Sequence, residues 1–321
     1  MSENGYAFAV ASVRTRENEL LSPSFMSQLL ESDYDECVRL LADKGVIPRD
    51  ADDPAAALSG YMKDTWEFLS SIAPDMSKLN FLIVKNDFHN LKAILKSMVA
   101  NVDCREFFLE PCVLDPEELY SAVKEKQFDS LPGWISKPAE NGYSLITSTL
   151  DGQLLDMYLD ARSFAAMRDF ARESGSEYSS ELTELQIALA DIKVALRLSR
   201  GSVSENLVSR AFCECESLDT DELARAVLKG RGEVIAYIGT TDHAQLLNSL
   251  ETSAAEFEKA CDNMIVEKLS KSKYYSLSGE PLTAYYYARE NECRLLRIIL
   301  SCKHLGLEKG KITERMRELY V

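Results

Sequence analysis

Apolar side chains recur along most of the chain three or four residues apart. The clearest runs of this kind are Phe25–Leu30, Leu91–Met98, Leu185–Leu196 and Leu295–Leu300. This spacing gathers the apolar side chains on one face of an α-helix, which is then buried against other helices. No segment shows a convincing alternation of apolar and polar residues, so the pattern predicts an all-α fold.

Several helix starts are marked by a side chain that can cap the first turn. Ser22 and Asp115 each precede a proline, which fits the first helical position. Asp219 is followed three residues later by Glu222, as in a capping box, and Asp33 is expected to cap the next helix. We expect loops at residues 44–53, 131–142 and 276–281.

One of these starts belongs to a repeated motif. Leu114–Val123 matches Leu218–Val227 at six of ten positions, an offset of 104 residues, and Leu21–Leu30 is a weaker third copy. We call this motif the cap helix.

A second motif, which we call the acid helix, combines an acidic residue with basic residues that follow it. Its copies begin at Asp87, Asp191 and Glu292, with offsets of 104 and 101 residues. Because two separate motifs share one offset, the sequence predicts three related helical units of about 100 residues. We expect the three acids near helix starts, where the helix dipole favours them, or in ion pairs with a neighbouring unit.

We place the predicted units at residues 1–105, 106–210 and 211–321, with the N- and C-terminal segments able to pack together. The composition agrees with long helices, since 14 glycines and 9 prolines in 321 residues are few turn formers, and 46% of the residues are hydrophobic.

Charge narrows the range of partners. The formal net charge is −16, which weighs against nucleic-acid binding and against direct contact with an acidic membrane surface. The stretch from Arg289 to the last residue has the opposite sign, with eight basic and five acidic residues. It is either a solvated helix face or a contact with a partner, and the candidate interface residues are Arg289, Arg294, Arg297 and Lys303.

The residues do not form a convincing catalytic, cofactor-binding or metal-binding set. Gly306–Thr313 is one residue too short for a phosphate-binding loop, and Cys213 and Cys215 lack the second pair that structural zinc requires. The eight cysteines are scattered, as expected for reduced, buried thiols of a cytosolic protein. The first residues do not form a secretory leader pattern, and no apolar run is long enough to span a bilayer. We therefore expect neither an enzyme nor a cofactor.

Five segments together resemble one known family. They are Tyr6–Arg14, Arg16–Leu21, Asp87–Lys92, Tyr287–Lys303 with Gly306-Leu307, and Ile312–Val321. Over essentially the whole length, the chain resembles the C-type central-stalk subunits of archaeal and bacterial V/A-type ATP synthases, which correspond to the d-type stalk protein of the eukaryotic vacuolar enzyme. The second copy of the acid helix departs from the pattern, with Val194 where the first copy has Asn90.

The resemblance implies a funnel-like protein of three similar helical bundles without an active site. It implies a socket on the cytoplasmic face of the membrane proteolipid ring, which contacts the membrane through that ring alone. The socket would receive the central shaft, made of D- and F-type subunits, and so link ring rotation to proton or sodium transport and to ATP synthesis or hydrolysis. The alternative is an unrelated all-helical repeat protein that acts as a scaffold or adaptor.

Overall fold

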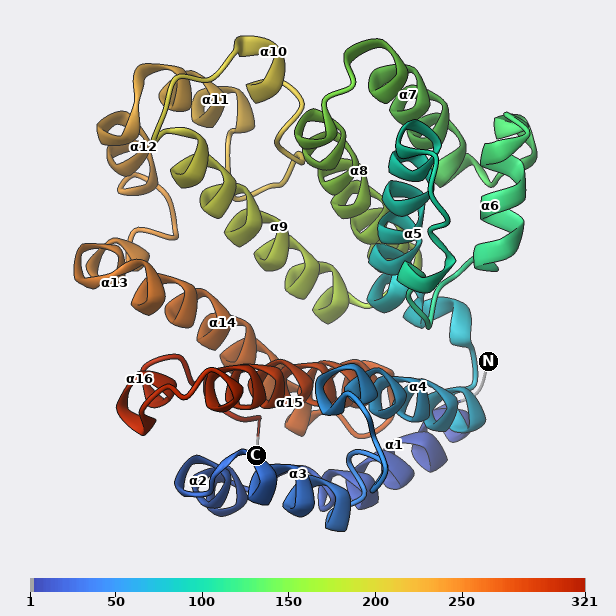
Figure 1. Ribbon diagram of the computed structural model, residues 1–321, viewed down its shortest axis with the longest axis vertical. Coiled ribbons are helices and arrows are strands. Elements are labelled where there is room, and N and C mark those ends of the chain that lie inside the picture. The colour runs from blue at the N-terminus through green and yellow to red at the C-terminus, as the bar shows by residue number, and fades with distance from the viewer. Residues whose placement is uncertain (1–2, 321) are drawn as a thin grey trace. The chain divides into compact units, whose positions relative to one another are not determined.

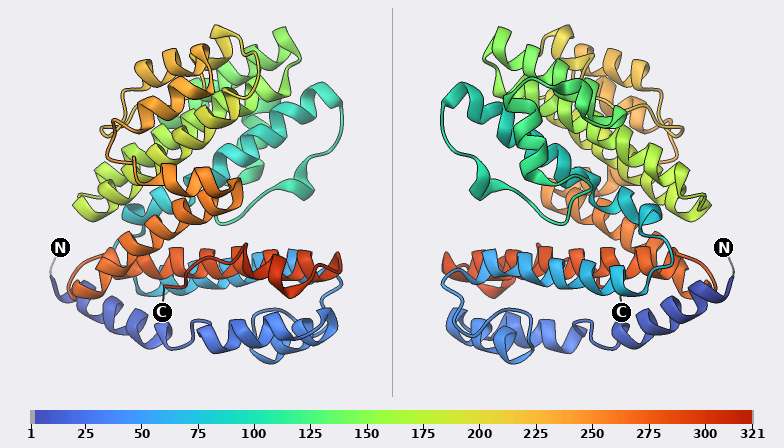
Figure 2. Two further views of the ribbon diagram at one scale, coloured as in Figure 1. Left: turned by 90° about the vertical axis from the view of Figure 1, so that its left-hand side faces the viewer. Right: turned by 90° about the vertical axis from the view of Figure 1, so that its right-hand side faces the viewer.

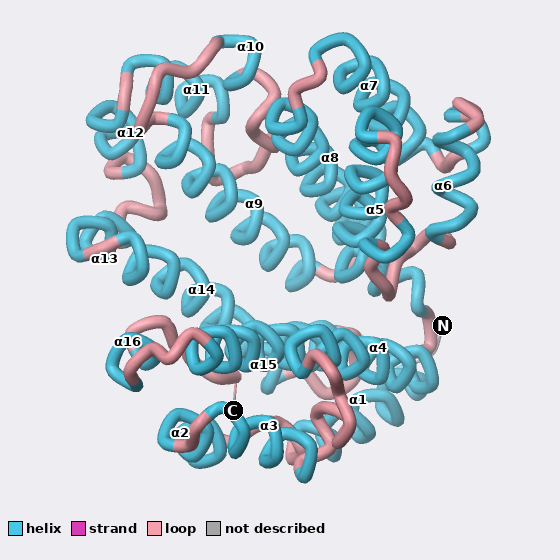
Figure 3. Tube along the Cα trace, viewed as in Figure 1, coloured by secondary structure: helices cyan, strands magenta, loops and turns pink. Residues whose placement is uncertain are grey.

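The structure is a computed structural model that describes residues 3–320. Helices joined by loops make up this part of the chain, without a strand among the described residues (Figure 3). The predicted all-α class is therefore confirmed. The chain forms two compact units (Figure 1): unit 1 combines the chain up to Met76 with the chain from Leu246 onward, and unit 2 is Ser77–Gln245.

Unit 1 contains helices from both ends of the sequence. They are α1 (Glu3–Glu17), α2 (Pro23–Glu31), α3 (Tyr34–Asp43), α4 (Pro54–Ile72), α13 (Leu246–Thr252), α14 (Ala254–Ser270), α15 (Glu280–His304) and α16 (Lys309–Thr313). In both views of Figure 2, α4 and α15 lie side by side in one layer, and α1–α3 form a second layer along them. Contact between the N- and C-terminal segments is direct, because the Tyr320 hydroxyl donates to Glu17 over 3.2 Å.

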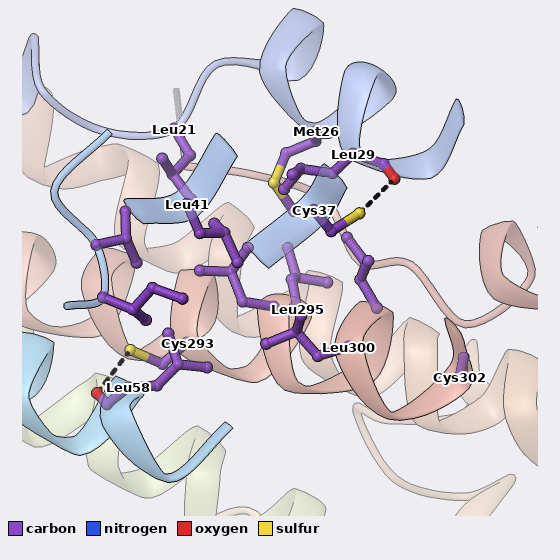
Figure 4. Close-up of a cluster of buried hydrophobic side chains, with 14 of the residues drawn as sticks. Leu21, Met26, Leu29, Cys37, Leu41, Leu58, Cys293, Leu295, Leu300 and Cys302 are labelled. Atoms are coloured by element: carbon purple, nitrogen blue, oxygen red, sulfur yellow. Dashed lines mark hydrogen bonds between the residues drawn. The ribbon is translucent and has the colours of Figure 1, made fainter. Parts of the chain in front are cut away.

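The core of unit 1 lies between these two layers (Figure 4). Leu29 of α2 and Leu41 of α3 meet Leu58 of α4 and Leu295 of α15, and all four side chains are fully buried. Two thiols in the same core donate to backbone carbonyls: Cys37 to Leu29 over 3.1 Å, and Cys293 to Leu58 over 3.7 Å. The 25-residue helix α15 thus supplies one continuous wall of the core.

Unit 2 is built around the pair formed by α5 (Asn80–Ala100) and α8 (Gly152–Glu173). The other α-helices of this unit are α6 (Pro116–Lys124), α7 (Gly133–Thr149), α9 (Glu177–Leu198), α10 (Glu205–Val208), α11 (Thr220–Lys229) and α12 (Arg231–Ile238). Short 3₁₀ turns at Met76–Leu79, Arg105–Phe107, Phe128–Ser130 and Lys271–Tyr274 complete the elements along the chain.

The predicted caps are confirmed at four helix starts. Ser22 accepts a hydrogen bond from Phe25 N–H, and Asp33 accepts one from Glu36 N–H. Asp115 accepts from two backbone N–H groups of the first turn of α6, and Asp219 accepts from Glu222 N–H in α11. Each cap satisfies a donor that the start of a helix leaves without a partner.

The expected loop at residues 131–142 is wrong, because α7 begins at Gly133 and runs through the whole remainder of that segment. Pro138 is the sixth residue of the helix, where its ring removes a single intrahelical hydrogen bond. Gly142 is a packing position: a Cβ atom there would lie 2.9 Å from Leu95 and 3.3 Å from Leu155. The glycine therefore lets three helices approach closely and does not form a turn.

The other two expected loops agree with the helix bounds, since α3 ends at Asp43 and α4 begins at Pro54, and residues 275–279 separate a 3₁₀ turn from α15. The three unit boundaries and the funnel arrangement stay predictions.

Candidate partner-binding surface

The three acids of the acid helices lie deep inside long helices. Asp87 is the eighth residue of α5, Asp191 the fifteenth of α9 and Glu292 the thirteenth of α15. All three are buried, with 1–2% of their surface exposed. The expectation that helix dipoles explain these acids is therefore wrong, since the dipole acts within the first turn. Their partners are backbone N–H groups of another segment.

Asp87 holds the segment that leads into α6. Its two carboxylate oxygens accept hydrogen bonds from the N–H groups of Val113 and Leu114, at 2.9 and 2.8 Å. Asn90, one turn further on, exchanges two hydrogen bonds with the backbone of Leu109, at 2.7 and 3.0 Å. Burial raises the pKa of Asp87 to about 6, although both backbone hydrogen bonds oppose the shift.

Asp191 makes the equivalent contact with a weaker set of partners. Its carboxylate accepts from Cys213 N–H at 3.2–3.3 Å, in the segment that leads into α11. Burial, together with the charge of Glu184, raises the pKa of Asp191 to about 8. Glu184 supports the same segment, because one of its oxygens accepts from Glu216 N–H and Ser217 N–H at 2.6 and 2.9 Å. Val194 at the position of Asn90 thus removes one backbone contact, and Glu184 supplies others.

Glu292 holds the segment that leads into α2. One of its oxygens accepts from Leu21 N–H, and the other accepts from the Tyr61 hydroxyl at 3.1 Å and from Arg289 at 3.2 Å. Burial raises the pKa of Glu292 in spite of the Arg289 cation. This acid is the one of the three that has a buried cation directly beside it.

The same contact therefore recurs three times: a buried carboxylate in an acid helix fixes the backbone just before a cap helix. The first two acids hold the cap helix that follows them in sequence, and Glu292 holds the first cap helix of the chain. Two of these contacts cross the predicted boundaries at residues 105/106 and 210/211. Buried hydrogen bonds of this kind hold the loops between the helices against the acid helices.

The four candidate interface residues divide into two pairs. Arg289 is buried, with 4% of its surface exposed, and its guanidinium contacts Glu292 and lies 4.6 Å from the Tyr61 ring centre. Lys303 is half-buried and donates to the carbonyls of Leu30 and Ser32 at the end of α2. Both side chains are therefore engaged inside unit 1, and neither offers a free cation at its surface.

Arg294 and Arg297 instead line an open groove of about 430 Å³ on unit 1. Arg315, which sequence reasoning did not select, joins them from the C-terminal segment, and Glu290 adds one acidic group. Arg294 pairs with Asp262 of α14 at 3.2 Å, and Asp262 also pairs with Arg317 at 2.9 Å. Arg297 forms no ion pair within residues 3–320. The groove therefore carries more positive charge than its own acids neutralise.

A larger groove of about 920 Å³ lies on unit 2, between α5, α8 and the loop that follows α5. Its basic side chains Lys92 and Lys96 pair with Asp160 and Asp156 of α8, both at 2.6 Å. The loop exposes Val102 and Phe107 at its rim. Sequence reasoning missed this groove, although the acid helix that forms its floor was recognised.

The remaining chemistry is sparse in the described part of the chain. Among residues 3–320, no group of three or more His, Cys, Asp or Glu side chains could hold a metal ion. The eight cysteines are free thiols, and burial raises the pKa of Cys37 to about 11 and of Cys213 to about 12. No helix within the same range is both long and apolar enough to cross a membrane.

Two helical units locked by buried carboxylates, with a basic groove open on one of them, fit a structural subunit that works through partners. A family model described as "ATP synthase (C/AC39) subunit" matches residues 9–315, and the chain belongs to this family. The resemblance found in the sequence is therefore confirmed. The chain is an accessory subunit of a rotary ATPase and not a catalytic one.

Three similar proteins align with this chain over almost the whole length of both sequences. The C-type subunit of the V-type sodium ATPase of Enterococcus hirae is 23% identical over 96% of this chain and 97% of its own. The C-type subunit of the A-type ATP synthase of Thermococcus kodakarensis is 22% identical over 98% and 91%, and that of the V-type ATP synthase of Thermus thermophilus is 21% identical over 97% and 98%.

Proposed function

We propose that this protein is the central-stalk socket of a rotary V/A-type ATPase, where it links a shaft of D- and F-type subunits to the membrane proteolipid ring. The observation that carries the proposal is the family match from residue 9 to residue 315, with the three relatives named above covered over at least nine tenths of their length. The protein is then a peripheral one on the cytoplasmic face, and its contact with the membrane runs through the ring.

The internal architecture supports a mechanical role. A part that passes torque must resist deformation, and this chain uses helices of 21–25 residues at its three acid-helix positions. Each is tied through a buried carboxylate to the start of another helix, so that the connecting segments are held as firmly as the helices.

Co-purification tests the proposal directly. The tagged protein, expressed in its own cell, should recover shaft subunits and proteolipid ring, and the isolated chain should not hydrolyse ATP. The double variant R294E/R297E should reduce this recovery, because it reverses the charge of the unit 1 groove. The matched control R225E/K229E reverses two exposed charges on α11 and should leave recovery unchanged. Recovery of no rotary-ATPase subunit would instead favour the scaffold or adaptor.

A further inference from the structure

The grooves of the two units occupy the same face of two acid helices. Counted from Asp87, the α5 residues in the unit 2 groove include those at +2, +5, +6, +9 and +10, which are His89, Lys92, Ala93, Lys96 and Ser97. Counted from Glu292, the α15 residues in the unit 1 groove include the same five positions, which are Arg294, Arg297, Ile298, Ser301 and Cys302. Positions +2 and +5 are His, Lys or Arg in both grooves. We call the five positions the basic row of the acid helix, and this row forms the floor of both grooves.

In unit 2 the chain itself shows what this row binds. Helix α8 packs along α5 and places Asp156 and Asp160 against Lys96 and Lys92. The two aspartates are four residues apart, so they project from one face of α8 on successive turns. In unit 2, positions +5 and +9 of the row thus bind carboxylates of an acidic helix.

In unit 1 the helix that packs along the acid helix α15 is α4. Both helices begin after an aspartate cap, Asp53 in α4 and Asp151 in α8. At five and nine residues after the cap, α8 has Asp156 and Asp160, whereas α4 has Leu58 and Met62, which pack in the core. Helix α4 therefore offers no carboxylate to the basic row of α15 at these two positions.

The charge balance of the unit 1 groove follows from this difference. Arg294 has Asp262, which it shares with Arg317. Arg297 is exposed and forms no ion pair within residues 3–320, and Arg315 adds a third guanidinium. Arginine binds carboxylates through paired, directional hydrogen bonds, which suits a fixed contact under load.

We propose that the α15 groove binds an acidic helix of a partner subunit, whose two carboxylates contact Arg294 and Arg297. Arg297 stands at position +5, where Lys92 of α5 binds Asp160 of α8. The proposal rests on the proposed function for the origin of the partner, which is another protein of the stalk. It adds the residues that receive that partner and the side-chain pattern that they recognise.

Photo-cross-linking in the assembled complex tests the proposal. A photoreactive phenylalanine analogue at position 297, or at 301 on the same groove floor, should cross-link to a helix with two acidic residues on one face, located by mass spectrometry. The same analogue at exposed position 225 should not cross-link to that helix. Cross-links only to lipid, to a segment without this acidic pair, or to no subunit of an assembled complex would overturn the proposal.

Charge exchange tests the same contact independently. R294E/R297E should lower recovery of the cross-linked subunit about tenfold, and lysines at its two acidic positions should restore recovery. Unchanged melting of the purified variant shows that folding is not the cause. A variant that recovers the partner as well as the parent protein would overturn the proposal. A tagged parent protein that recovers no rotary-ATPase subunit would instead refute the proposed function, and this result is distinct from both failures above.

Discussion

Asp191 provides the most demanding test of how the buried carboxylates work. The substitution D191N replaces an acid that is 2% exposed, has Cys213 N–H as its backbone partner, and forms no ion pair within residues 3–320. The asparagine carbonyl can still accept from that N–H group, and the amide does not titrate. The variant therefore keeps the contact and removes the cost of burying a charge.

The sign of the effect follows from the raised pKa. Asp191 titrates near 3.8 in the unfolded chain and at about 8 in the folded protein. Its contribution to stability is complete below the unfolded value and is lost as the pH rises toward the folded value. Each pH unit in that window changes the free energy of unfolding by about 1.4 kcal/mol, so that D191N should gain about 3 kcal/mol over the parent protein between pH 5 and pH 7.5.

Urea unfolding at a series of pH values measures this difference. Trp66 lies in unit 1 and Trp134 in unit 2, so a W66F background leaves one tryptophan, which reports on the unit that contains Asp191. The variant D221N, at an exposed position of α11, is the control and should follow the parent protein. Stability curves for D191N and parent that stay parallel from pH 5 to pH 7.5 would refute the reasoning.

The remaining predictions concern an ion pair and a helix crossing. E292Q leaves the buried Arg289 cation with only the more distant carboxylate of Glu19, at 3.9 Å, among residues 3–320. It should lower the stability of unit 1 by about 3 kcal/mol, measured by denaturant unfolding with Trp66 as the reporter, and an unchanged midpoint would contradict this role. G142A should lower the stability of unit 2 by about 1–3 kcal/mol, because its Cβ atom would meet Leu95 at 2.9 Å. The control G232A places its Cβ atom in open space and should not destabilise the protein. Equal melting temperatures of the two variants would contradict close packing of the helices at Gly142.

The helices and their caps could be predicted from the sequence, because interactions between neighbouring residues determine them. Helical spacing and capping side chains act within one or two turns, and the caps at Ser22, Asp33, Asp115 and Asp219 are confirmed. Gly142 was misinterpreted for the opposite reason, since its role depends on Leu95 and Leu155 in other helices.

The roles of the acidic and basic motif residues were harder to predict, because they depend on contact partners that lie far away in the sequence. Asp87 sits in the motif beside basic residues, yet its partners are backbone N–H groups 26 and 27 residues away. Arg289 and Arg294 lie five residues apart in one basic stretch, yet one is buried beside Glu292 and the other faces a groove. The two side chains differ because residues five apart lie on different faces of α15. The helical period predicts this difference once the bounds of the helix are known.

The three carboxylate contacts also explain why unit 1 contains both ends of the chain. In sequence, Asp87 and Asp191 each precede the cap helix that they hold, whereas Glu292 follows the cap helix that it holds. Its partner is instead the segment before α2, at Leu21. The repeat is therefore permuted: the third acid helix and the first cap helix together complete one contact of the same type. The predicted boundaries at 105/106 and 210/211 separate Asp87 and Asp191 from the backbone groups that they bind. A boundary placed before each acid helix keeps both of these contacts within one unit. The third contact, between Glu292 and Leu21, then joins the two ends of the chain. Unit 1 contains this third pair, because it combines the chain up to Met76 with the chain from Leu246 onward.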